Sequence, residues 1–147
     1  IISFFSLINL LLLPNGVDYF IYLVILVSTM DIFAYVGGKI FGNKKIAPKI
    51  SAGKTIEGTL IGLAFTVIMS SIIKHLMNFN VYQALIAGVL IAILAFFGDL
   101  LESCFKRNIG IKDSGNLIPG HGGLLDRFDG YLLILPFYNI YLSSLLG

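Results

Sequence analysis

The chain has 147 residues, of which 57% are hydrophobic and 12% charged, and its mean hydropathy is +0.93. Soluble domains carry about 25% charged residues, so this composition excludes an ordinary soluble domain. The single cysteine, Cys104, excludes a fold that is held together by internal disulfides. The composition therefore predicts an integral membrane protein whose apolar surface is solvated by lipid.

Five apolar stretches follow one another along the chain, and we expect each of them to be helical in the membrane. A bilayer core needs about 20 apolar residues per helix, and unpaired strand edges cannot lie in lipid. The predicted spans are residues 1–13, 19–38, 59–77, 81–98 and 131–146. We expect the short first span to be the end of a helix in a chain truncated at its N-terminus. The predicted fold is an all-α, polytopic transmembrane bundle in a single membrane domain.

The charged residues are concentrated in two segments between the predicted spans. Nine of the ten Lys and Arg residues lie in residues 39–58 and 99–130. Because two predicted spans separate these segments, both lie on the same side of the membrane. The positive-inside rule predicts that this side is the cytoplasm. We therefore expect two charged cytoplasmic loops, in the inner membrane if the source is bacterial.

Residues 99–130 carry carboxylates and cations in a pattern that indicates a metal–phosphate site. If the preceding helix continues into this segment, four polar residues share one helical face: Asp99, Glu102, Ser103 and Lys106. Asp126 lies at the entry to the next span, and the segment can bring it to Asp99. Carboxylate oxygens are the ligands that Mg²⁺ prefers. The alternative is a solvated loop in which these charges merely pair with one another.

Asp31 is a second candidate, because it lies inside a predicted span. An ionised carboxylate there costs about 2.5 to 3.5 kcal/mol on insertion scales and usually faces a cavity or a partner. Tyr35 and Lys39 follow at i+4 and i+8, so the three side chains share a face that leads to the first charged loop. The alternative is an Asp31 that is held neutral or paired for a structural reason.

Three motifs carry a resemblance to a known family. The longest starts at Ser103 as S-C-F-K-R, continues with K-D-S-G and P-G-H-G-G, and ends with D-R-F-D at Asp129. D-I-F-A-Y starts at Asp31, and S-A-G-K-T-I-E-G starts at Ser51. These motifs resemble those of the phosphatidate cytidylyltransferases, or CDP-diacylglycerol synthases, over about residues 31–130. Ala52 and Gly53 stand where the family motif S-P-K-K-T-x-E-G has Pro and Lys.

The resemblance implies an enzyme that joins CTP and phosphatidic acid into CDP-diacylglycerol and releases pyrophosphate. It implies Mg²⁺ as the cofactor, alone or with a second cation. The expected catalytic residues are Asp99, Lys112, Asp113, Asp126 and Arg127, and the expected metal ligands are Asp99 and Asp126, with Asp113 and Asp129 as alternates. The expected substrate-binding residues are Asp31, Tyr35, Lys54, Thr55, Glu57, Ser103, Lys106, Arg107, His121, Gly122 and Gly123.

The expected partners are CTP, phosphatidic acid and the lipid bilayer, with no nucleic acid. Small-residue faces such as the G-x-x-x-G of Gly58 and Gly62 favour close helix packing, within the chain or in a homodimer. Two other functions stay open. A CTP-dependent polyprenol-type lipid kinase would share the nucleotide and the membrane, and an ion or solute transporter would place charges at mid-membrane.

Overall fold

The structure is a computed structural model, and it describes residues 2–48, 50–108 and 125–146. The described residues form five α-helices, one 3₁₀ helix and one antiparallel hairpin. In chain order the elements are α1 (Ile2–Leu12), α2 (Gly16–Phe41), β1 (Lys45–Ala47), β2 (Ser51–Thr55), α3 (Ile56–Ile72), the 3₁₀ helix η1 (Ile73–Met77), α4 (Val81–Asn108) and α5 (Leu125–Leu146).

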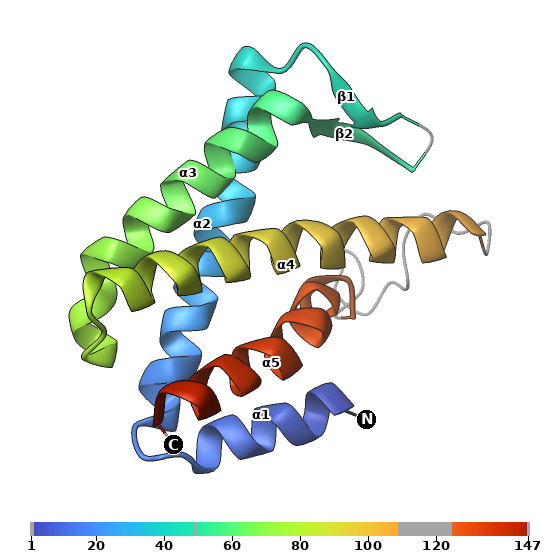
Figure 1. The fold of residues 1–147 in the computed structure, drawn as a ribbon. Helices are drawn as coiled ribbons and strands as arrows, with labels where there is room; N and C mark the ends of the chain where they lie inside the picture. The colour runs from blue at the N-terminus through green and yellow to red at the C-terminus, as the bar shows by residue number, and fades with distance from the viewer. Residues whose placement is uncertain (1, 49, 109–124, 147) are drawn as a thin grey trace.

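The helices form a bundle in which α2 packs against α3, α3 against α4, α4 against α5, and α5 against α1. Helix α4 crosses the α2–α3 pair in Figure 1, and α1 and α5 lie beside each other near the two ends of the chain. The hairpin of β1 and β2 stands at the end of α2 and α3 that lies away from both termini (Figure 1). The bundle therefore has a hairpin end and a terminal end.

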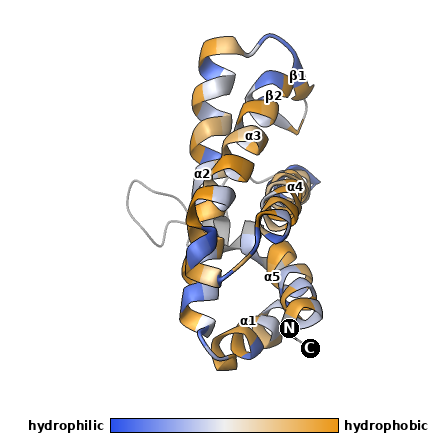
Figure 2. Cartoon of the chain, turned by 60° about the vertical axis from the view of Figure 1, so that its left-hand side comes forward, coloured by the Kyte–Doolittle hydropathy of each residue, from blue (hydrophilic) through white to orange (hydrophobic). Residues whose placement is uncertain are grey.

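Three of the described helices are long and apolar enough to cross a membrane: Gly16–Phe41, Ile56–Met77 and Val81–Asn108. Hydrophobic residues run along these helices in Figure 2, whereas hydrophilic residues gather on the connection from α2 to β1. The all-α membrane fold predicted from the sequence is confirmed. The shorter apolar helices are Ile2–Leu12 and Leu133–Leu145, and five crossings stay a prediction.

The hairpin was not predicted, because residues 39–58 were interpreted as a loop. Helix α2 continues through the first three of these residues and ends before Gly42, whose N–H donates to the Gly38 carbonyl at 3.0 Å. The strands then pair in antiparallel register, with Lys45 opposite Thr55 and Ala47 opposite Ser51. The strands are only three and five residues long, so their alternating pattern is too short to be recognised in sequence.

The second charged segment, residues 99–130, is helical at both of its ends. Helix α4 continues to Asn108, and α5 already begins at Leu125. No Gly or Pro interrupts residues 99–108, and Glu102 forms an ion pair with Lys106 at i, i+4 within them. Basic side chains in the last turn of α4 also suit the negative end of the helix dipole. The predicted spans cover only the apolar part of each helix, whereas the backbone of α4 continues into the polar segment, as the shared helical face expected there requires.

Close contact between α2 and α3 depends on the small residues Gly58 and Gly62. A Cβ on Gly58 would lie 2.5 Å from the carbonyl oxygen of Ala34, and a Cβ on Gly62 would lie 2.9 Å from the carbonyl oxygen of Met30. Both contacts are with backbone atoms, which cannot move aside without separating the helices. The G-x-x-x-G face therefore packs within the chain.

Candidate functional site

A cavity of about 330 Å³ lies at the hairpin end, between α2, β2, α3 and α4. Its polar lining is Asp31 and Tyr35 from α2, Ser51, Lys54 and Thr55 from β2, Thr59 from α3 and Asp99 from α4. Apolar side chains, among them Met30 and Phe96, complete the wall. The cavity thus collects residues from two of the three sequence motifs and from the helix that leads into the third.

Lys54 and Asp99 form an ion pair that joins β2 to α4. The Lys54 side chain is 20% exposed and the Asp99 side chain 47%, so the carboxylate is open to solvent while the lysine is largely covered. The Lys54 ammonium also lies 5.6 Å from the centroid of the Phe96 ring, within the range of a cation–π interaction. These two contacts hold the positive charge at the wall of the cavity.

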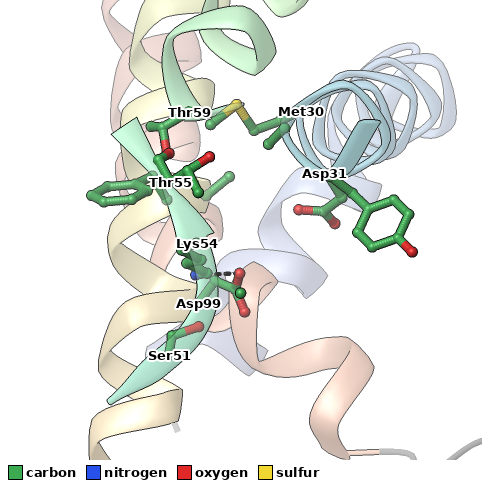
Figure 3. A pocket seen from close by; sticks show the side chains of 12 residues that line it. Met30, Asp31, Ser51, Lys54, Thr55, Thr59 and Asp99 are labelled. Atoms are coloured by element: carbon green, nitrogen blue, oxygen red, sulfur yellow. Dashed lines mark hydrogen bonds and ion pairs between the residues drawn. The ribbon is translucent and has the colours of Figure 1, made fainter. Parts of the chain in front are cut away.

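The carboxylate of Asp31 points from α2 toward the Lys54–Asp99 pair across the cavity (Figure 3). Asp31 lies close enough for its charge to interact with both members of the pair. Asp31, Lys54 and Asp99 are separated widely in sequence, and the fold brings them to one place. A cavity with two carboxylates and one ammonium can bind a cation and a phosphate group at the same time.

Thr55 and Glu57, both predicted to bind substrate, have structural contacts. Thr55 is the N-cap of α3, and its hydroxyl accepts a hydrogen bond from the N–H of Gly58 at 3.2 Å. Thr55 also lines the cavity, but Glu57 does not. The Glu57 carboxylate accepts hydrogen bonds from the N–H groups of Asn43 and Lys44, which follow the end of α2. The contacts of Glu57 are therefore with the backbone of its own chain.

The remaining predicted residues of α4 do not line the cavity. Lys106 pairs with Glu102 on the same helix, and the Nε–H of Arg107 donates to the Ile50 carbonyl at 3.4 Å. Arg107 thus connects the end of α4 to the tip of the hairpin. Ser103 lies on the same turns of α4 and is partly buried. Their binding of substrate stays a prediction.

For the other predicted residues the structure describes either nothing or the backbone alone. Lys112, Asp113, His121, Gly122 and Gly123 lie outside the described residues. Asp126, Arg127 and Asp129 belong to the first turns of α5. Tyr131, which follows Asp129 by two residues, lies close enough to Asp31 for the two side chains to interact electrostatically. The start of α5 therefore approaches the cavity, and a site shared by Asp99 and Asp126 stays a prediction.

The cavity offers oxygen ligands, which are the ligands that a hard cation such as Mg²⁺ prefers. Asp31 and Asp99 supply carboxylate oxygens, and the hydroxyl of Ser51 is a third oxygen on the wall. Within residues 2–48, 50–108 and 125–146, no group of three or more His, Cys, Asp and Glu residues could hold a metal ion. The remaining ligands of a Mg²⁺ ion held here would come from the segment after α4, from the substrate or from water.

Several cavity residues were not predicted as site residues, among them two hydroxyl groups and an aromatic ring. Ser51 and Thr59 line the cavity, and Phe96 supports the Lys54 ammonium. Thr59 follows Thr55 by one helical turn, and Phe96 precedes Asp99 by three residues. The helical period alone could therefore have placed them beside residues that had been identified.

Helices long and apolar enough to cross a membrane, with a cavity lined by acidic and basic side chains at one end, describe an integral membrane protein with a charged cavity. Residues 1–145 match the cytidylyltransferase family, and the chain belongs to that family. The family predicted from the three motifs is confirmed.

Curated relatives carry the corresponding name. The chain is 41% identical over 133 residues to the phosphatidate cytidylyltransferase of Staphylococcus haemolyticus strain JCSC1435, which covers 89% of this chain and 51% of the relative. It is 43% identical over 130 residues to that of Staphylococcus aureus strain COL, covering 87% and 50%. The uncharacterized protein YnbB of Escherichia coli K12 is 45% identical over 135 residues, covering 88% and 45%. The chain spans about half the length of these relatives.

Proposed function

We propose that this chain forms the catalytic part of a phosphatidate cytidylyltransferase, which joins CTP and phosphatidic acid to give CDP-diacylglycerol and pyrophosphate. The observation that carries the proposal is the cavity in which Asp31, Lys54 and Asp99 meet. Family membership and the names of the relatives support the same reaction.

The reaction explains why the site holds charges rather than a strong base. A phosphate oxygen of phosphatidic acid attacks the α-phosphorus of CTP, and the bond from that phosphorus to the oxygen of the β-phosphate breaks. The attacking oxygen already carries negative charge, so no proton has to be removed from it. The barrier comes from bringing two anions together and from the charge on the departing pyrophosphate, which positioned cations reduce.

In this proposal Lys54 binds a phosphate of CTP, and Asp99 and Asp31 hold the cation that accompanies it. Bound Mg²⁺ would neutralise phosphate charge and stabilise the leaving pyrophosphate. Asp126 is the expected further ligand, with Asp113 and Asp129 as alternates. The expected phosphate contacts are Lys106 and Arg107 at the end of α4, Lys112 after it, and Arg127 in the first turn of α5.

The experiment that tests the activity is an identification of the lipid product. The full-length protein in detergent is given phosphatidic acid and CTP labelled in the cytosine ring, and the lipid fraction is analysed by mass spectrometry. The proposal predicts CDP-diacylglycerol with the labelled cytidine and one equivalent of pyrophosphate. CDP release with phosphorylation of a lipid alcohol would identify the kinase alternative and overturn the proposal.

The cavity is proposed to open on the cytoplasmic side, where CTP is available. Lys39, Lys44 and Lys45 lie exposed at the hairpin end, in agreement with the positive-inside rule. In sealed inner-membrane vesicles of known orientation, a membrane-impermeant maleimide should modify a thiol introduced by Lys45→Cys from the cytoplasmic side only. A thiol introduced by Asp18→Cys should react from the opposite side. Modification of both from the same side would contradict this orientation.

A homodimer stays a prediction. Because Gly58 and Gly62 pack against α2, a second copy would have to use another face of the bundle. Light scattering of the full-length protein in detergent, corrected for bound detergent, would measure the number of copies.

A further inference from the structure

Glu57 is the only acidic residue between α2 and the first turn of α3, and its carboxylate lies outside the cavity lining. Oε2 of Glu57 accepts a hydrogen bond from the N–H of Asn43 at 3.1 Å and from the N–H of Lys44 at 3.2 Å. Oε1 lies 3.4 Å from the same Lys44 nitrogen. A carboxylate that binds two successive backbone N–H groups is well placed to fix the course of the chain between them.

These bonds lie at the base of the hairpin, where residues 43–44 enter β1 and residues 56–57 leave β2. The N–H of Ile56 donates to the Lys44 carbonyl at 2.9 Å, and the strand pairing begins at the next position, where Lys45 lies opposite Thr55. Lys44 is therefore bonded through both its carbonyl and its N–H to the start of α3. A two-stranded hairpin is marginal by itself, so its position depends on such contacts at its base.

Lys54 lies directly beside this base. The next residue, Thr55, pairs with Lys45 and also caps α3 through its bond to Gly58. The tight contact of Gly58 with the Ala34 carbonyl fixes the start of α3 on α2, three residues beyond Asp31. The Glu57 bonds thus tie the end of α2 to the start of α3, and Lys54 precedes that start by two residues.

We infer that Glu57 is a positioning residue for the proposed nucleotidyl transfer: its bonds to Asn43 and Lys44 fix the hairpin so that Lys54 is held beside Asp99. The inference rests on the proposed function for the role of Lys54 with CTP. It assigns Glu57 no contact with substrate or metal, in contrast to the substrate contact expected from its motif. The structural part of the inference, the hold on the hairpin, does not depend on the activity.

Two conservative substitutions separate positioning from direct binding. Glu57→Gln keeps an oxygen at the end of a side chain of equal length, which can still accept the two N–H bonds, but it removes the charge. Glu57→Asp keeps the charge on a side chain that is shorter by one methylene and cannot reach both N–H groups. A positioning residue tolerates Gln better than Asp, whereas a metal or cationic contact tolerates Asp better than Gln.

The expected result concerns KM more than kcat. In the full-length protein, Glu57→Ala should raise KM for CTP about tenfold, the scale expected for lost hydrogen bonds to a charged group, with a smaller change in kcat. Glu57→Gln should restore most of the affinity and Glu57→Asp should not. The matched control is Asp18→Asn, a charge removed from the terminal end of α2, which should leave KM unchanged. The reverse order, with Asp active and Gln inactive, would overturn the inference.

A double mutant tests whether Glu57 acts through Lys54. If it does, Glu57→Ala should change KM by less than about twofold in a Lys54→Met background, because coupled residues are not additive. A full additional tenfold loss would overturn the inference.

Hydrogen exchange gives a readout that requires no turnover. Glu57→Ala should speed amide exchange in residues 43–47 and 51–55, with exchange unchanged in α5, and Glu57→Gln should restore protection. Unchanged exchange in the hairpin would overturn the inference. Faster hairpin exchange in Glu57→Ala, together with a wild-type protein that forms no CDP-diacylglycerol, would overturn the proposed function. It would still support the role of Glu57 in fixing the hairpin.

Discussion

The two ends of the helical bundle are held together by different chemistry. At the hairpin end, Lys54 and Asp99 form an ion pair beside Asp31, and a cavity opens between the elements that carry them. At the terminal end, hydrogen bonds between neutral groups join the helices that the structure describes. The Tyr22 hydroxyl lies 2.6 Å from the Ser70 hydroxyl, which in turn donates to the Ala84 carbonyl, and this joins α2, α3 and α4.

Helix α5 joins the terminal end in the same way. The Tyr141 hydroxyl donates to the Gln83 carbonyl at 2.7 Å, and the Tyr138 hydroxyl donates to the Tyr19 carbonyl at 3.3 Å. Tyr22, Ser70 and Tyr138 are completely buried, whereas Asp99 is half exposed. Neutral hydroxyl bonds stabilise helix contacts in lipid at little desolvation cost, so charge is reserved for the end where a polar ligand could enter. We therefore expect changes at the hairpin end to affect activity and changes at the terminal end to affect stability.

The largest expected effect is on turnover at the hairpin end. Asp99→Asn keeps the shape of the side chain but removes the charge that a hard cation needs, and turnover should fall about 100-fold or more. The melting temperature in detergent should change little, because the side chain is half exposed. The test is an assay of the full-length protein at limiting Mg²⁺, with Asp18→Asn as the control. Near-normal turnover of Asp99→Asn would show that Asp99 binds no essential cation.

The next effect tests how the site is supported by packing. Gly58→Ala places a Cβ against two backbone segments of α2, at Ala34 and Gly38, and should destabilise the protein by about 1–3 kcal/mol, as overpacked sites do. Gly53→Ala is the matched control, because a Cβ there meets nothing within 4 Å. Thermal unfolding in detergent compares the two variants. Equal melting temperatures would mean that the α2–α3 contact relaxes without cost.

The smallest effect is expected at the terminal end. Tyr22→Phe removes the hydroxyl bonded to Ser70, and it should lower the free energy of unfolding by about 1 kcal/mol, the scale of interhelical hydrogen bonds in membranes. CTP turnover should stay at the wild-type level. Tyr82→Phe, at an exposed tyrosine near the same end, should have no effect on either quantity. A loss of turnover with unchanged stability in Tyr22→Phe would contradict the division between the two ends.

The sequence predicted the helices better than the connections. Long apolar stretches define α2, α3 and α4 because lipid selects for continuous apolarity. Helices α4 and α5 extend beyond the predicted spans, since polar residues such as those of Asp99–Asn108 continue a helix as readily as they form a loop. The hairpin was missed because its order comes from side-chain contacts, above all those of Glu57, rather than from strand periodicity.

The sequence predicted several residues of the candidate site, but it did not predict which of them contact one another. Motif resemblance singled out Asp31 and Lys54, and the polar helical face singled out Asp99, but only the fold brings the three together. Motif resemblance also gave Glu57 and Thr55 the same expected role as Lys54. The structure separates them, because Thr55 caps a helix and Glu57 bonds to backbone N–H groups. Residues of one motif can thus line the cavity or hold the backbone around it, and the sequence pattern alone does not distinguish these two roles.

The most direct test of the account is whether CTP occupies the cavity. On a Cys104→Ser background, Gly53→Cys introduces a thiol into the cavity lining at an exposed position where a side chain meets no neighbour. CTP with Mg²⁺ should slow alkylation of this thiol several-fold, ATP with Mg²⁺ should slow it much less, and a thiol introduced by Asp18→Cys should react at the same rate throughout. Equal alkylation at position 53 with and without saturating CTP would contradict the assignment of the nucleotide to this cavity.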